Sequence, residues 1–185
     1  MNHLTKTAEM IEEKLYWQIV AESLKNSNNQ ADQSQNLVNQ LIQLNAMDIV
    51  GFKLRTDQLL FATYLSDIWC AGYLLNRGCS ADGFENFRNW IISRGKDVYY
   101  KGKENPDSLV DQVEHERQLY EFEEFFYLGP SAFDTKTGQT LYDYIDEDNF
   151  IYQRSEYPDM VFTWHEEQPN SIKKICPKLF AKLYY

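Results

Sequence analysis

The chain has 185 residues, of which 43% are hydrophobic, and this is enough for one globular domain whose core needs no disulfide or metal scaffold. Aromatic residues make up 15% of the chain, whereas it contains only 8 glycines and 5 prolines, a composition that excludes a disordered or low-complexity protein. The formal net charge of −10 argues against nucleic-acid binding, because contacts with phosphates need clustered cations.

Helical periodicity dominates the first hundred residues. Apolar side chains recur with the helical period over about residues 8–24, 32–45 and 48–64, which predicts three amphipathic helices. The next predicted helix, from Ser66 to Leu75, is almost wholly apolar and is therefore expected at the centre of the fold. After a turn at residues 76–80, helices are predicted over 84–95, with Gly95 as a left-handed cap, and over 97–103.

The second half of the chain is less regular. Pro106 suits the first turn of a helix, and the pattern predicts one long helix over residues 108–127. Beyond Gly129 and Pro130, the β-prone segments 150–152 and 160–164 suggest a small β-hairpin, and Pro177 limits any terminal helix to about the last eight residues. We therefore predict a mainly α fold: a single-domain multi-helix bundle over residues 1–138, and a less regular C-terminal extension over 139–185 that packs on it and is not an independent domain.

The charges are distributed unevenly along the chain. Residues 1–103 hold 11 basic and 11 acidic side chains, residues 104–167 hold 3 basic and 17 acidic, and residues 168–185 hold 4 basic and none acidic. The middle segment thus has a net charge of 3 − 17 = −14, which would steer a basic partner by long-range attraction. The alternative is a solvated face that only keeps the protein soluble.

Tyrosines and phenylalanines alternate with the carboxylates of this acidic segment. Rigid aromatic rings supply contact energy at protein interfaces, while carboxylates supply steering and selectivity. We therefore expect a non-enzymatic acidic module that binds a basic protein, as an immunity or antitoxin-like protein would. The side chains expected to contact that partner are Glu121, Glu124, Tyr142, Asp143, Asp146, Glu147 and Asp148.

The cysteines and the N-terminus bear on the cellular compartment. Cys70, Cys79 and Cys176 are odd in number and have no zinc-like spacing, so buried reduced thiols are expected. The first residues lack the apolar core of a signal peptide, and the longest apolar run is about eight residues, against the roughly twenty that a membrane span requires. These observations predict a cytoplasmic protein that binds neither membranes nor nucleic acid.

An ordered motif occupies the segment from Trp69 to Ile91, whose sequence is WCAGYLLNRGCSADGFENFRNWI. It resembles a bacterial family known as domain of unknown function 4240, whose members have W-x-A-A-Y-L-I-x-G-G-C-S-D-D-x-F-x-x-F-R-x-W-L. Further similarity at residues 16–20, 105–109 and 133–138 extends the resemblance to about residues 10–138. The resemblance implies a helical fold and no established activity. Arg77 stands in place of the family's first glycine in the turn, and Ala81 in place of its first aspartate.

Two interpretations of this motif stay open. In the architectural one, Gly78 permits a tight turn and either Ser80 or Asp82 caps the following helix. In the functional one, an arginine clamps a carboxylate or phosphate in an aromatic-lined pocket of an uncharacterised enzyme or a small-ligand binding protein. The residues of that pocket would be Trp69, Tyr73, Ser80, Asp82, Arg88 and Trp90.

Catalytic constellations are not found in the sequence. His3, His115 and His165 do not have the spacing of metal ligands, and there is no phosphate-binding loop or nucleophile elbow. Among the cysteines, Cys79 alone is at the head of a helix, where a thiolate is stabilised. We therefore predict no catalytic residues, no metal and no cofactor, and the balance favours a binding protein over an enzyme.

Overall fold

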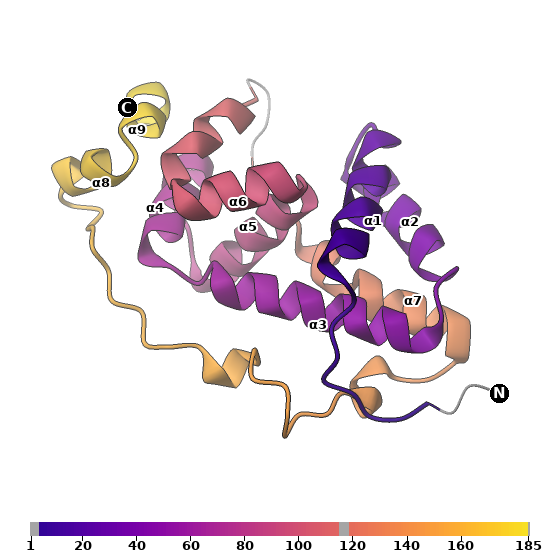
Figure 1. The fold of residues 1–185 in the computed structure, drawn as a ribbon. Coiled ribbons are helices and arrows are strands. Elements are labelled where there is room, and N and C mark those ends of the chain that lie inside the picture. The colour runs from indigo at the N-terminus through magenta and orange to yellow at the C-terminus, as the bar shows by residue number, and fades with distance from the viewer. Residues whose placement is uncertain (1–3, 115–118, 185) are drawn as a thin grey trace. The chain divides into compact units, whose positions relative to one another are not determined.

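The computed structural model describes residues 4–114 and 119–184, and helices make up most of them (Figure 1). Within these residues, β-structure is limited to one isolated bridge between Thr7 and Ile145. The mainly α fold class is therefore confirmed. The chain forms two compact units: Met1–Phe61 with Glu123–Tyr157, called unit 1, and Ala62–Phe122 with Pro158–Tyr185, called unit 2. The predicted boundary at residue 138 stays a prediction, since residues 139–157 belong to unit 1 and residues 158–185 to unit 2.

Unit 1 is held together by α-helices from both parts of its chain. Its elements are α1 (Glu13–Lys25), α2 (Gln30–Leu41), α3 (Ala46–Ala62), the 3₁₀ helix η2 (Glu123–Tyr127), α7 (Leu128–Thr137), and the 3₁₀ helices η3 (Leu141–Tyr144) and η4 (Arg154–Glu156). Helix α2 packs against both α1 and α7. In the core, Tyr16 stacks on Phe52 with ring centroids 4.5 Å apart, and its hydroxyl shares a 3.0 Å hydrogen bond with Thr56.

The segment before α1 is extended and is tied to α3. The amide of Ile11 donates to the carbonyl of Gly51 at 3.1 Å. A Cβ at Gly51 would lie 2.7 Å from the Ile11 nitrogen, so only glycine permits this approach. Because this contact takes a backbone donor away from the helical pattern, α1 begins at Glu13, later than the predicted start at residue 8.

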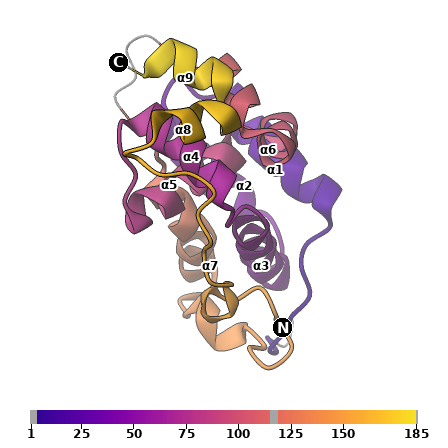
Figure 2. The same cartoon turned by 90° about the vertical axis from the view of Figure 1, so that its left-hand side faces the viewer.

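Unit 2 is arranged around α4 (Ser66–Asn76), the apolar helix that was expected at the centre. Its other elements are α5 (Ala81–Ser93), α6 (Lys96–Glu104), the 3₁₀ helix η1 (Pro106–Gln112), α8 (Pro169–Ile175) and α9 (Pro177–Leu183). Helix α4 contacts α5, α8, α9 and η1, and Figure 2 shows α8 and α9 lying beside it. Both C-terminal helices begin at a proline, which the first turn of a helix accepts because its amides have no intrahelical acceptor.

The predicted long helix over residues 108–127 is wrong. The chain instead forms η1 and later η2, and residues 113–114 and 119–122 between them are not helical; residues 115–118 lie outside the described residues. The amide of Tyr120 donates to Oδ1 of Asn76 at 2.6 Å, and the amide of Phe122 donates to the carbonyl of Asn86 at 3.0 Å. These bonds to α4 and α5 replace the i to i−4 bonds of a helix and allow both aromatic rings to be buried.

The suggested β-hairpin is also not formed, and residues 150–152 and 160–164 contain no strand. Phe150 is buried in unit 1, where Tyr152 packs edge-on against Phe61 with ring centroids 5.5 Å apart. In unit 2, the amide of Thr163 donates to Oγ of Ser66 at 3.0 Å, so it is bonded to the start of α4. An isolated two-stranded hairpin is marginal in water, and each segment is more stable against its own helical core.

Helix α7 was not predicted, because Gly129 and Pro130 were taken as a break in the helical pattern. Both residues lie in the first turn of α7, where proline is tolerated. No helix among residues 4–114 and 119–184 has the length and apolar character that a membrane crossing requires.

Candidate functional site

Unit 1 exposes a group of tyrosines and carboxylates on η2, on η3 and on the loop after η3. Tyr127 is 54% exposed and Tyr142 is 43% exposed, which is unusual for such large rings. We call this surface the acidic patch and define it as Glu124, Tyr127, Tyr142, Asp143, Asp146, Glu147 and Asp148. All the predicted partner residues except Glu121 therefore lie in unit 1.

The two tyrosines of the acidic patch are neighbours. Partial burial is the main cause that raises the pKa of Tyr142, and the nearby Asp57 carboxylate and Tyr127 contribute further. Tyr127 packs edge-on against Phe126, with ring centroids 5.1 Å apart. Because its pKa is raised, the Tyr142 hydroxyl stays protonated at neutral pH and is available to donate a hydrogen bond.

A buried lysine supports the acidic patch from below. Lys53 of α3 is 2% exposed, and its Nζ donates to Oδ1 of Asp57 at 2.5 Å. The same Nζ lies 4.0 Å from the ring centroid of Phe126 and 5.9 Å from that of Tyr142. Helix α7 lies close to Lys53, since a Cβ at Gly129 would be in ordinary van der Waals contact with Cβ of Lys53, at 3.4 Å. A desolvated cation thus holds the rings in place, and cation–π contacts are strongest in such surroundings.

Sequence reasoning did not single out Lys53 or Asp57. The available signal was a lysine inside an apolar stretch, with an aspartate four residues later, which is the spacing of an intrahelical ion pair. This spacing predicts the ion pair but not its burial, because the rings that cover Lys53 come from η2 and η3, far along the chain.

The acidic loop after η3 has a defined backbone. The amide of Asp146 donates to the carbonyl of Thr7 at 2.9 Å, and Nδ2 of Asn149 donates to Oδ2 of Asp146 at 2.8 Å. Glu124 is held separately, because its Oε2 accepts a 3.1 Å hydrogen bond from Oγ of Ser34. The exposed carboxylates Asp143 of η3 and Glu147 and Asp148 of the loop therefore project from a fixed support.

Two residues of the predicted anion pocket lie inside unit 2 rather than at a solvent-accessible rim. Arg88 is 2% exposed and Trp90 is fully buried. Cζ of Arg88 lies 4.7 Å from the ring centroid of Phe84 and 5.2 Å from that of Tyr64. An arginine surrounded by core aromatic rings supports the architectural interpretation of the motif.

Trp69 and Tyr73 of the predicted pocket both lie on α4, where aromatic residues near the C-terminus pack on them. Trp69 stacks on Phe84 with ring centroids 4.3 Å apart and meets Phe162 edge-on at 5.1 Å. Tyr73 meets Trp164 at 5.2 Å. The two side chains are thus covered in part by residues that sequence reasoning had left outside the pocket.

Ser80 and Asp82 lie at the start of α5, and Glu121 lies close to the same turn. Oγ of Ser80 caps the helix by accepting a 3.1 Å hydrogen bond from the amide of Gly83, whereas Asp82 is exposed. Glu121 lies over the same turn, since a Cβ at Gly83 would be 3.1 Å from its Oε1. A carboxylate is favourable there because a helix N-terminus carries partial positive charge. Glu121 is therefore positioned at the start of α5, while the other predicted partner residues belong to unit 1.

Cys79 does not meet the condition for a reactive nucleophile. Burial, and next the Glu121 carboxylate, raise the pKa of its thiol to about 12, although Arg88 acts in the opposite direction. The thiol therefore stays protonated at neutral pH. In the described part of the chain, no three His, Cys, Asp or Glu side chains are grouped so as to hold a metal ion. His165 is exposed, and His3 and His115 lie outside the described residues.

Residues 10–135 match the family described as protein of unknown function (DUF4240). The chain belongs to this family. The matched range covers α1 to α6 and nearly all of α7, and it includes the motif from Trp69 to Ile91 on which the resemblance was based. No curated protein and no solved structure matches the chain.

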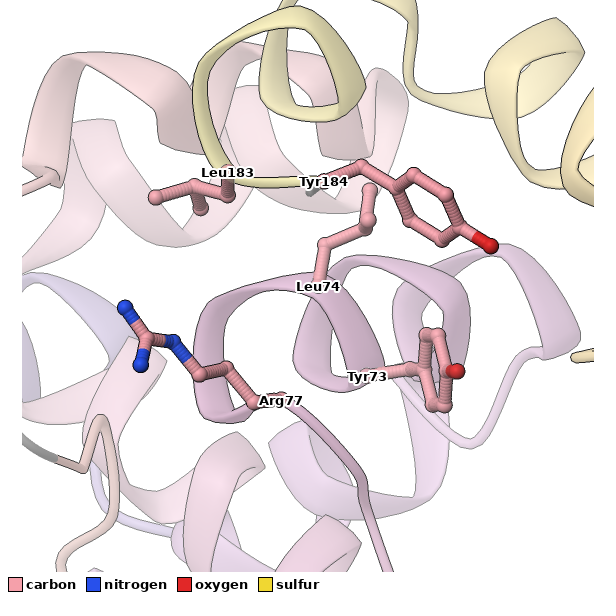
Figure 3. Close-up of a pocket in the computed structure, with 5 residues that line it drawn as sticks. All are labelled: Tyr73, Leu74, Arg77, Leu183 and Tyr184. Carbon is pink, nitrogen blue, oxygen red and sulfur yellow. The ribbon is translucent and has the colours of Figure 1, made fainter.

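Part of this DUF4240 member lies beyond the matched range. The acidic loop after η3 and helices α8 and α9 all follow residue 135. In unit 2, the end of α9 and the end of α4 enclose a cavity of about 330 Å³ (Figure 3). The cavity is lined by Tyr73, Leu74, Arg77, Leu183 and Tyr184. It shares Tyr73 with the predicted pocket, but its guanidinium comes from Arg77 rather than Arg88.

Proposed function

We propose that this DUF4240 member is a non-enzymatic binding module that holds a basic protein on its acidic patch, as an immunity or antitoxin-like protein would. The observation that carries the proposal is the neighbouring pair Tyr127 and Tyr142, which are both exposed, while the buried Lys53 lies beneath the ring of Tyr142. Exposed aromatic rings surrounded by charged groups are typical of the energetic centre of a protein interface.

The preorganisation of the acidic patch favours binding. A ring that is already held loses little conformational freedom when a partner covers it, so more of its contact energy appears as affinity. The Phe126 ring and the Lys53–Asp57 pair provide this support for Tyr142 and Tyr127.

The charge of the acidic patch favours a basic partner. The cation beneath the patch, Lys53, is balanced by Asp57 and sealed from solvent, so it does not offset the carboxylates at the surface. Exposed carboxylates attract a basic protein over a distance of about one Debye length, roughly 8 Å at physiological ionic strength. They should therefore act mainly on the rate of association, and salt should reduce their effect.

The test begins with a pull-down at low salt from the cells in which the protein occurs, followed by binding kinetics with the purified, retained basic protein. The acidic-loop variant replaces three exposed carboxylates of η3 and of the loop after it (Asp143→Asn, Glu147→Gln and Asp148→Asn), and it should lower the association rate constant by about tenfold at low salt, with little change in dissociation. Tyr142→Ala should instead speed dissociation by about tenfold or more.

A matched control variant removes three negative charges from unit 2 instead of unit 1. Glu104→Gln, Asp111→Asn and Asp159→Asn neutralise three exposed carboxylates of unit 2 and should leave the association rate almost unchanged. The proposal fails if no basic protein is retained, if association does not depend on salt, or if the control variant slows association as much as the acidic-loop variant does.

We further propose that the protein acts in the cytoplasm, with neither nucleic acid nor a membrane as a partner. The support is the state of its cysteines: Cys70 and Cys176 are free and buried, and their side chains are neighbours. Buried reduced thiols of this kind are typical of a reducing compartment. Cell fractionation with an antibody against the native protein tests this location.

A further inference from the structure

The cavity of unit 2 between the ends of α4 and α9 has the size of a small-molecule site. Its volume of about 330 Å³ falls in the range of about 300–1,000 Å³ that is usual for ligand pockets. Two leucines and two tyrosine rings provide apolar walls, and one arginine and two phenol hydroxyls provide polar groups. Polar and apolar groups contribute about equally to this lining, so it can contact the apolar body of a small organic ligand and orient its polar group.

Arg77 has an unusual backbone for a residue with a side chain. It ends α4 in the left-handed conformation, with φ 57° and ψ 43°, and in the described part of the chain it is the non-glycine residue with a positive φ. Glycine is the usual residue at such a helix end. Arginine persists here at a cost in backbone strain, and strained residues of this kind are concentrated at functional sites.

The guanidinium of Arg77 is available to a ligand. Arg77 is exposed, and among the described residues no carboxylate lies within salt-bridge distance of it. Its backbone is fixed, because the carbonyl of Tyr73 accepts hydrogen bonds from the amides of both Arg77 and Gly78. The arginine thus starts from a defined point at the end of α4.

The opposite wall of the cavity is held rigidly. At the start of α9, the backbone amides of Lys178 and Leu179 both donate to Oδ1 of the buried Asp107, at 2.8 and 2.9 Å. At the other end of α9, the ring of Tyr184 stacks on that of Phe180 with centroids 4.3 Å apart. The cavity is therefore formed before any ligand enters, which reduces the entropic cost of binding.

The polar groups of the cavity are separated along its length. Figure 3 shows the guanidinium of Arg77 at one end, the hydroxyls of Tyr73 and Tyr184 at the other, and Leu74 between them. Burial and the nearby Glu166 carboxylate raise the pKa of Tyr73, so its hydroxyl remains protonated. One end of the cavity is therefore cationic, and the other end offers neutral hydroxyl groups.

We propose that this cavity binds a small organic acid, with its single carboxylate on Arg77 and its apolar or aromatic body between Leu74, Leu183 and the tyrosine rings. The planar guanidinium matches a carboxylate with two parallel hydrogen bonds. A singly charged acid fits better than a phosphate ester, because Arg77 is the sole cation among the described residues that line the cavity, and Glu166 lies near its far end. This site is in unit 2 and is independent of the acidic patch of unit 1.

The experiment compares acids with their neutral counterparts. 3-Phenylpropionate, indole-3-acetate and 4-hydroxyphenylacetate are each tested beside the corresponding primary amide, by thermal denaturation of the full chain. For a Kd of about 1 mM, an acid at about 10 mM should raise Tm by about 3–6 °C. The amides should give no comparable shift, because they lack the charge that pairs with Arg77.

Variants locate the site. Arg77→Gly relieves the backbone strain, so it should fold normally and yet lose the acid-dependent rise in Tm, while Arg77→Lys should keep part of it. Tyr184→Phe should weaken 4-hydroxyphenylacetate binding more than 3-phenylpropionate binding. In the wild-type protein, the acids should shift the methyl NMR signals of Leu74 and Leu183.

Two control variants separate this proposal from that of the acidic patch. Arg154→Gly removes an exposed arginine of unit 1, and the acidic-loop variant removes three carboxylates; both should retain acid binding. The proposal is overturned if none of the acids shifts Tm, if the amides act as strongly as the acids, or if Arg77→Gly binds the acids as the wild type does.

Discussion

Each unit buries one cation against aromatic rings, but the two cations have different surroundings. Arg88 of unit 2 lies in α5, where every residue from Phe87 to Ser93 is buried. Lys53 of unit 1 is equally buried, yet its partner Asp57 is half-buried and the ring of Tyr142 above it reaches solvent. The same cation–π interaction therefore stabilises an interior in unit 2 and supports an exposed surface in unit 1.

This difference shows why a buried charge does not by itself indicate a binding site. A cation enclosed by core rings is inaccessible to any ligand, whereas a cation beneath exposed rings acts on a ligand through them. Arg77 is an accessible cation of unit 2, and it is exposed at the cavity between α4 and α9.

Replacement of Arg88 gives the largest expected effect. Arg88→Ala should lower the free energy of unfolding by about 3–5 kcal/mol, because it removes a large buried side chain and its ring contacts and leaves a cavity. Urea denaturation measures this loss, and Arg88→Met, which fills most of the space, should cost less. A loss below about 1 kcal/mol would contradict the architectural role of Arg88 and return it to the list of candidate ligand residues.

Replacement of Lys53 should have an intermediate effect. Lys53→Met keeps the packing but leaves Asp57 without its cation, and we expect a loss of about 1–2 kcal/mol in the free energy of unfolding. Because Asp57 retains access to water, the loss should be smaller than that for Arg88→Ala. A double-mutant cycle with Asp57→Asn tests the pair. If the two losses in the free energy of unfolding are additive, Lys53 and Asp57 have no stabilising interaction, and the pair does not support the acidic patch.

Replacement of Arg77 should have the smallest effect, with the opposite sign. Arg77→Gly relieves the left-handed backbone conformation but gives the unfolded chain more freedom, so we expect a net gain of about 0.5 kcal/mol in the free energy of unfolding. Urea denaturation of the variant and of the wild type measures this gain. A clear loss of stability would mean that the Arg77 side chain contributes to the core, in contrast to its exposed position.

Helix formation was predictable wherever neighbours along the chain decide it. The amphipathic stretches of α2, α3 and α6 and the cap at Ser80 follow from local spacing, and the structure agrees with them within a few residues. The predictions failed where groups from other parts of the chain form hydrogen bonds with the backbone amides. Asn76 and Asn86 take the amides of Tyr120 and Phe122, and no pattern within residues 108–127 contains that information.

The candidate sites show the same division. The exposed carboxylates of the acidic loop were predicted because a dense run of acidic residues cannot be buried without partners. The roles of the two arginines of the motif were not predictable, because residues outside the motif help to decide them. Tyr64 helps to bury Arg88, and the end of α9 forms the cavity beside Arg77.

By itself, the sequence determined the helical class, the family and the acidic character of this protein, because periodicity, motif order and charge are properties of neighbouring residues. The tertiary structure decided which cation is enclosed, which supports a surface and which is exposed beside a cavity. The free energy of a charged side chain depends on the groups that surround it in space, and for Lys53, Arg77 and Arg88 those groups include residues from outside their own helix.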